Sequence, residues 1–104
     1  MDIRTVAVIG AGTMGAGIAQ VCAQTGWETR LYDAFSEGLE KGMDTIDSFW
    51  EKGIARGKTT QQEKVKWLAN ISQYTDLREA VKGVDLVIEA VPEKMELKQQ
   101  IFAQ

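Results

Sequence analysis

Residues 6–15 read Val6-Ala7-Val8-Ile9-Gly10-Ala11-Gly12-Thr13-Met14-Gly15, a short apolar run that ends in a glycine-rich turn. The first four residues are continuously apolar, which predicts a parallel strand buried on both faces. From Thr13 to Thr25 apolar residues recur at helical spacing, and Gly26 is placed to end this helix. The predicted apolar face of the helix consists of Met14, Ile18, Val21 and Cys22. A strand, a tight turn and a helix are therefore expected in direct succession.

The turn matches the pattern G-x-G-x-x-G, which alone is weak evidence because glycine-rich turns are common. Its context is more specific, because an acid, Asp33, follows the last glycine by 18 residues at the end of the next predicted strand. Gly10 would permit the tight turn, Gly12 would let the backbone approach a pyrophosphate, and Gly15 would allow close packing of the helix on the sheet. The simpler alternative is a glycine turn that only joins a strand to a helix.

The same pattern predicts how a dinucleotide would be held. Backbone N–H groups around Gly12, Thr13 and Met14, aided by the helix dipole, are the expected phosphate donors. The Asp33 carboxylate would accept hydrogen bonds from the ribose hydroxyls and would repel a 2'-phosphate, which favours NAD over NADP. The two residues after it supply no cation for such a phosphate. The alternative for Asp33 is a solvated acid at a strand end.

The rest of the chain alternates predicted strands and helices. Further strands are expected at Trp27–Asp33, Ile71–Thr75 and Val84–Val91. A long helix capped by Ser36 carries an apolar stripe and can end at Gly57, although Gly38, Gly42 and Gly53 weaken this prediction. The stripe consists of Leu39, Met43, Ile46, Trp50 and Ile54. Thr60 with Glu63 forms a capping box for a helix to about Ala69, and Asp76 with Glu79 caps a further turn or two.

These elements predict an α/β fold, a Rossmann-type doubly wound parallel sheet with helices on both faces. Residues 1–104 are expected to form one NAD-binding domain. Pro92 interrupts the last strand before a helix that is expected to continue to Gln104. We therefore expect a truncated sheet whose last strand, Val84–Val91, has an open edge that favours self-association into a homo-oligomer.

Composition narrows the partners and the chemistry. The chain has 12 Lys and Arg against 15 Asp and Glu, a net charge of −3, so neither a nucleic acid nor a membrane is an expected partner. No signal peptide or membrane span is evident, and the single cysteine, Cys22, is expected in the core, which favours a cytoplasmic location. The absence of histidine removes the commonest general base and metal ligand, so neither a catalytic residue nor a metal site is predicted.

Two stretches resemble the 3-hydroxyacyl-CoA dehydrogenase family. The first is Val8–Gln20, which contains the glycine turn, and the second is Asp85–Lys98, a strand followed by an E-A-V-x-E turn and a lysine. The resemblance implies that Ala90 and Val91 lie beside the ribose, and that Glu93 and a helical Lys98 face the nicotinamide half of NAD. Without the family, Glu93 and Lys98 are solvated helix charges.

The resemblance also implies an activity and its substrate. The family oxidises a 3-hydroxyacyl-CoA to the 3-oxoacyl-CoA in fatty-acid metabolism, with a histidine, a glutamate, a serine and an asparagine that all follow this region. This chain is therefore expected to bind NAD without useful turnover, as the N-terminal part of a longer protein with a C-terminal catalytic and dimerisation domain. Lys52, Arg56 and Lys58 would meet the phosphate-rich end of the acyl-CoA, or else form an ordinary charged helix end.

Three alternatives remain open at this point. The Pro92-Glu93-Lys94 form of the second motif also resembles carnitine dehydrogenases and other short-chain hydroxyacid enzymes of the same superfamily. A methyltransferase also places its S-adenosylmethionine at a glycine-rich turn with an acid after the second strand. A module that senses NAD without turnover would equally lack catalytic residues.

Overall fold

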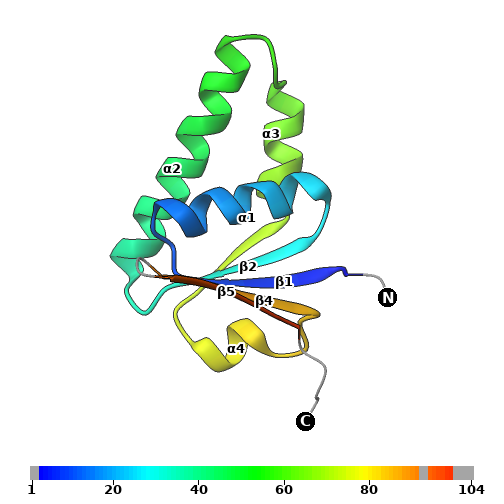
Figure 1. The fold of residues 1–104 in the computed structure, drawn as a ribbon. Helices are drawn as coiled ribbons and strands as arrows, with labels where there is room; N and C mark the ends of the chain where they lie inside the picture. Colours follow the sequence, from blue (N-terminus) through cyan, green and yellow to red (C-terminus); the bar gives the residue numbers. More distant parts are fainter. Residues whose placement is uncertain (1–2, 92–93, 100–104) are drawn as a thin grey trace.

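The computed structural model describes residues 3–91 and 94–99, which form one mixed β-sheet with helices on both faces (Figure 1). The strands are β1 (Thr5–Ile9), β2 (Glu28–Tyr32), β3 (Ile71–Tyr74), β4 (Leu86–Val91) and β5 (Lys94–Gln99), in the spatial order β3-β2-β1-β4-β5. The helices are α1 (Thr13–Thr25), α2 (Ser36–Ala55), α3 (Gln61–Leu68) and α4 (Leu77–Val81). The first four strands are parallel, so the carboxyl ends of β1, β2 and β4 meet at one edge, where open α/β sheets bind ligands.

The side chains of strand β1 pack into two hydrophobic clusters, one on each face of the sheet. Its side chains alternate, with Val6 and Val8 in the core cluster on the α1 side and Ala7 in a second cluster with Val84 and Val87. Helices α1, α2 and α3 lie on one side of the sheet and α4 lies on the other (Figure 1). A strand covered on both sides must be apolar throughout, which confirms the doubly wound arrangement predicted from its continuous apolar run.

The buried face of α1 differs from the predicted stripe. Met14 and Val21 are 48% and 60% exposed, while the buried side chains are mostly small. The buried residues of the helix are Gly15, Ala16, Ala19, Gln20, Cys22 and Ala23. Small residues recurring every three or four positions let the helix approach the sheet closely, so Met14 and Val21 are exposed and Ile18 is only partly buried against the core. Burial of Cys22 is as predicted, and it raises the pKa of the thiol.

Helices α2 and α3 form a hairpin that projects from the sheet (Figure 1). Trp50, 1% exposed, donates its indole N–H to Gln24 Oε1 at 3.0 Å and packs on Trp67 with ring centroids 5.4 Å apart. Lys64 crosses between the helices to pair with Asp47 and Glu51, and its hydrogen bonds to these carboxylates, Asp47 first, raise its pKa. The pair of buried Trp50 and partly buried Trp67, together with the ion pairs of Lys64, therefore holds the hairpin together.

The helix boundaries confirm most of the predicted caps. Thr60 and Glu63 form the predicted capping box, and Asp76 accepts a hydrogen bond from the Glu79 amide at 3.2 Å. The predicted N-cap of α2, Ser36, is wrong by one residue. The N-cap is Phe35, in extended conformation, and Ser36 already lies in the helix. No side chain caps this end. The α2 glycines, which weakened the prediction, do not interrupt the helix.

The predicted helix after Pro92 is wrong, because β5 runs antiparallel to β4 from Val91 opposite Lys94 to Leu86 opposite Gln99. The unpaired N–H and C=O groups along β4 supply the physical reason, since a returning strand satisfies them. The alternation of Met95 and Leu97 with charged residues has the period of two that a strand requires. The sheet is thus mixed, and the edge of β4 that was expected to stay open is covered.

Asp85 joins the beginnings of β4 and β1. One carboxylate oxygen accepts hydrogen bonds from the backbone N–H groups of Arg4 at 2.9 Å and Thr5 at 3.1 Å. These bonds, Arg4 first, favour the charged form and lower the pKa of Asp85. Across residues 3–91 and 94–99, none of the helices has the length and apolarity to cross a bilayer.

Candidate functional site

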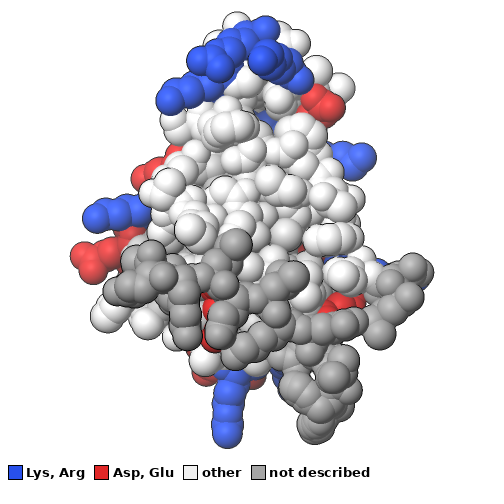
Figure 2. All heavy atoms as spheres, in the orientation of Figure 1, with Lys and Arg blue, Asp and Glu red and all other residues white. Residues whose placement is uncertain are grey.

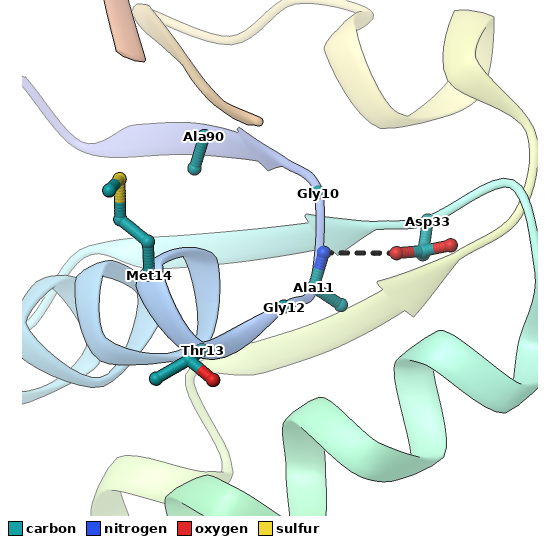
Figure 3. A pocket seen from close by; sticks show the side chains of 7 residues that line it. All are labelled: Gly10, Ala11, Gly12, Thr13, Met14, Asp33 and Ala90. Carbon is teal, nitrogen blue, oxygen red and sulfur yellow. Dashed lines mark hydrogen bonds between the residues drawn. The ribbon is translucent and has the colours of Figure 1, made fainter. Parts of the chain in front are cut away.

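A cavity of about 490 Å³ opens at the carboxyl ends of β1, β2 and β4 (Figure 3). It is lined by Gly10, Ala11, Gly12, Thr13, Met14, Asp33 and Ala90. The volume lies within the usual range for small-molecule and cofactor sites. The structure thus brings together six predicted site residues from three separate segments, the glycine turn, the end of β2 and the end of β4, and adds Ala11.

The glycine turn is tight because two of its glycines approach other backbone atoms. Gly10 has φ of +107°, a conformation that disfavours L side chains, and a Cβ there would lie 2.5 Å from the Ala90 carbonyl oxygen. A Cβ on Gly15 would overlap the carbonyl oxygen of Gly10. Gly15 therefore permits α1 to start directly against the turn, rather than lining the cavity itself.

Gly12 behaves differently from these two glycines. It is the N-cap of α1, its φ of −70° suits any residue, and a Cβ placed on it would meet no protein atom within 4 Å. The protein itself therefore does not require glycine here, whereas a ligand occupying that space would. The first N–H groups of a helix have no intrahelical acceptor, so those of this turn can bind an anion that approaches Gly12.

Asp33 lies at the other side of the turn and is held by two backbone donors. Its Oδ2 accepts from the Ala11 N–H at 3.0 Å, and its Oδ1 accepts from the Phe35 N–H at 3.0 Å (Figure 3 shows the first bond). The carboxylate thus links the glycine turn to the start of α2 while it lines the cavity. Sequence reasoning missed Ala11, and the variable position between two glycines of the motif held no signal for it.

Other predicted residues fall in different places. Ala90 lines the cavity with 5% of its surface exposed, and Val91 is the last residue of β4. Lys98 lies in β5 opposite Val87, so the structure does not place it on the helix that the resemblance implied. Glu93 lies outside the described residues. Among the described residues, the turn, Asp33 and Ala90 form the site, and the roles of Glu93 and Lys98 toward the nicotinamide stay predictions.

Two further cavities continue from the glycine turn along α2. The first, of about 390 Å³, is lined by Ala11, Gly12, Thr13, Lys41, Asp44 and Thr45. The second, of about 380 Å³, is lined by Asp44, Thr45, Ser48, Phe49 and Lys52. Because neighbouring cavities share lining residues, the three lie in a row from the turn along α2. Within the described part of the chain, no group of three or more His, Cys, Asp or Glu side chains is arranged to hold a metal ion.

The chain is similar to a family of NAD-binding domains and to known dehydrogenases. The family model described as "3-hydroxyacyl-CoA dehydrogenase, NAD binding domain" matches residues 5–104. The chain is 42% identical, over its whole length, to the 3-hydroxyadipyl-CoA dehydrogenase of Escherichia coli K12, covering 22% of that protein. It is 36% identical to a probable 3-hydroxybutyryl-CoA dehydrogenase of Bacillus subtilis, over 98% of the chain and 35% of the relative.

A solved structure gives the same result for the fold. The crystal structure of (S)-3-hydroxybutyryl-CoA dehydrogenase from Ralstonia eutropha superimposes with a TM-score of 0.84 at 40% sequence identity. The match covers 89% of this chain and 32% of that one. The chain therefore spans roughly a fifth to a third of the length of these relatives.

Proposed function

Since the chain belongs to the 3-hydroxyacyl-CoA dehydrogenase family, whose NAD-binding domain it forms, we propose that it holds NAD for the oxidation of a 3-hydroxyacyl-CoA in fatty-acid metabolism. The observation that carries the proposal is the cavity in which the start of α1 and the Asp33 carboxylate converge. Two features of a dinucleotide, a pyrophosphate and a ribose diol, match these two groups.

The residues of the turn bind and orient the cofactor. The free N–H groups at the start of α1 would receive the pyrophosphate in the space beside Gly12, with about half a positive charge from the helix dipole behind them. Asp33 would accept from the ribose hydroxyls, and its negative charge would exclude a 2'-phosphate. When bound, NAD accepts the hydride from the carbon that carries the hydroxyl. Ala90 and Val91 would line the ribose.

Titration calorimetry of the chain with NAD, NADP and S-adenosylmethionine tests this proposal. We expect binding of NAD, weaker binding of NADP because of the charge at Asp33, and no heat from S-adenosylmethionine. Tighter binding of S-adenosylmethionine would instead support a methyltransferase. Loss of NAD binding in Gly12→Val, with the fold intact by circular dichroism, would locate the cofactor at the turn.

The reaction itself needs groups beyond these residues. The substrate hydroxyl must give up a proton to a base, and the chain contains no histidine for that role. We propose that residues 1–104 form the cofactor domain of a longer protein whose remaining part supplies the base, so that this chain binds NAD without turnover. Hydride transfer by this chain alone, measured as NADH absorbance with 3-hydroxybutyryl-CoA, would contradict this. NAD binding by a whole protein without any activity would favour an NAD-sensing module.

The acyl-CoA is proposed to follow the row of cavities along α2. Lys52, Arg56 and Lys58 are exposed at the end of α2 and in the loop after it, and Figure 2 shows basic side chains gathered at the tip of the hairpin. Lys52 lies ten residues after Gly42, about 15 Å along the helix, so a phosphate group bound here would be remote from the turn. Their replacement by glutamine should raise the KM of the whole protein for the acyl-CoA and spare that for the acyl-pantetheine, which lacks the nucleotide.

A short 3-hydroxyacyl-CoA such as 3-hydroxybutyryl-CoA is proposed first, with carnitine or a free hydroxyacid as the alternative. Activity of the whole protein with carnitine but not with the thioester would favour the alternative. Glu93 and Lys98 are proposed to face the nicotinamide half, and Lys98→Ala should then weaken NAD more than ADP-ribose, which lacks the nicotinamide.

We further propose a cytoplasmic homo-oligomer that binds neither nucleic acid nor membrane. The buried free thiol of Cys22 suits a reducing compartment. Among the described strands, β5 lies at an edge of the sheet, where a second copy could pair. Light scattering over a range of concentrations and cell fractionation test these two points. A strict monomer at high concentration contradicts the first, and a periplasmic or extracellular fraction contradicts the second.

A further inference from the structure

Helix α2 starts with two glycines one turn apart, Gly38 and Gly42, although glycine is the least favourable helix residue after proline. Each lies against a residue that lines the cavity at the glycine turn, Gly38 against Asp33 and Gly42 against Ala11. A Cβ on Gly38 would lie 2.7 Å from Cγ of Asp33 and 2.8 Å from each of its carboxylate oxygens. A Cβ on Gly42 would lie 2.7 Å from the Ala11 carbonyl oxygen. These separations are too short for real contacts, so an alanine at either position forces a shift.

A shift of the Asp33 carboxylate would strain the two hydrogen bonds that hold it. It is held at 3.0 Å by the Ala11 N–H on one side and at 3.0 Å by the Phe35 N–H on the other. The cavity lies on its free side. A methyl group at Gly38 would therefore displace the carboxylate at the expense of these bonds, and one at Gly42 would press on the turn that contains the first donor.

We propose that Gly38 and Gly42 are positioning residues for the cofactor. Because they have no side chains, the first two turns of α2 pack closely against Asp33 and Ala11. The ribose-binding carboxylate and the phosphate-binding turn are thereby held in a fixed relative position before the dinucleotide binds. Neither glycine is expected to touch NAD. The inference rests on the proposed function, because it concerns the same cavity.

The test compares Gly38→Ala and Gly42→Ala with Gly53→Ala in the full chain. Gly53 is the matched control, since it lies in the same helix and a Cβ there would meet only the side chain of Thr59, at 2.9 Å from Oγ1. We expect Gly38→Ala to weaken NAD about tenfold by calorimetry, the size of one displaced charge-assisted hydrogen bond. Gly42→Ala should weaken NAD in the same direction, and Gly53→Ala should bind NAD like the wild type.

A double-mutant cycle with Asp33→Ala separates positioning from general damage to the helix. Asp33→Ala removes the three atoms that lie nearest to the new methyl group, so Gly38→Ala should then cause no further loss of NAD affinity and no further fall in melting temperature. If Gly38→Ala alone fails to fold, the double variant should fold again. A double variant that is still unfolded, or losses that simply add, would overturn the inference.

The outcomes distinguish this inference from the proposed function. Absence of NAD binding by the wild type removes the proposed function. Normal NAD affinity in Gly38→Ala, together with weakened affinity in Asp33→Ala, removes only the positioning role and leaves the cofactor site in place. A lowered melting temperature with unchanged affinity would likewise show that these glycines serve packing alone.

Discussion

Replacing Asp33 by alanine should change cofactor preference and stability together, because the carboxylate serves both the cavity and the fold. It accepts two backbone hydrogen bonds at 3.0 Å, of which the bond from Ala11 is partly buried and the bond from Phe35 is exposed. Hydrogen bonds to a charged acceptor contribute about 1.5–3 kcal/mol when sheltered, and exposed ones contribute less. We therefore expect the free energy of unfolding to fall by about 2 kcal/mol, which thermal unfolding by circular dichroism measures.

The effect on the two cofactors should have opposite signs. NAD loses the charged acceptor of its ribose hydroxyls, which should weaken its binding about tenfold to a hundredfold. NADP gains from the removal of charge repulsion, because two unit charges about 5 Å apart repel by about 1–3 kcal/mol at an effective dielectric between that of water and that of a protein surface. The ratio of the two dissociation constants should therefore change by at least about thirtyfold.

Calorimetry with both cofactors, at low and high ionic strength, measures this ratio. The repulsive part should shrink as salt is added, whereas the hydrogen-bonding part should persist. Glu37→Ala is the control, since Glu37 is an exposed acid in the first turn of the same helix that Asp33 contacts. The reasoning is refuted if Asp33→Ala weakens NAD and NADP by the same factor, because the carboxylate would then act only through the fold.

Three other predictions follow from the same structure. Gly12→Val should abolish NAD binding with an unchanged melting temperature. Gly15→Ala should lower the melting temperature sharply, because its Cβ overlaps the Gly10 carbonyl. Equal melting temperatures for the two variants would contradict this prediction. The pKa of Asp85 is lower in the folded state than in the unfolded state, so its carboxylate stabilises the fold above the unfolded pKa of about 3.9. This contribution is lost as the pH falls through the folded-state pKa. Asp85→Asn should therefore reduce the dependence of the free energy of unfolding on pH in the acid range, measured by urea titration. Trp50→Ala should cost about 3–5 kcal/mol in urea unfolding, since the ring is fully buried; a cost below about 1 kcal/mol would mean that the hairpin is not anchored by this residue.

The glycine turn was predictable because every signal for it is local. A β-branched run, three glycines at fixed spacing and a following amphipathic segment act within residues 6–26, and the structure places a strand, a turn and a helix there. The capping box at Thr60 and Glu63 was predictable for the same reason. Burial of particular side chains was not, because Met14 and Val21 satisfy helical periodicity yet lie outside. Periodicity identifies a face, but the closeness of the neighbouring sheet selects small residues for it.

The strand after Pro92 could not be predicted from its own residues. The same residues are compatible with a charged helix or with an alternating strand, and the unpaired edge of β4 favours the strand. The alternation within residues 94–99 permits a strand but does not select it, since the edge that they pair with belongs to β4, whose other partner, β1, is distant in sequence.

Local residue patterns thus determined the turn and the strands around it and favoured a dinucleotide as the ligand, because backbone conformation and charge at those positions are properties of neighbouring residues. Only the tertiary structure decided that Asp33 accepts hydrogen bonds from Ala11 and Phe35, and that Gly38 and Gly42 of α2 pack against Asp33 and Ala11. The physical reason is close packing. An isolated glycine in a helix is only a weak point in sequence, and its purpose becomes visible when the atom that occupies the place of its missing side chain is known.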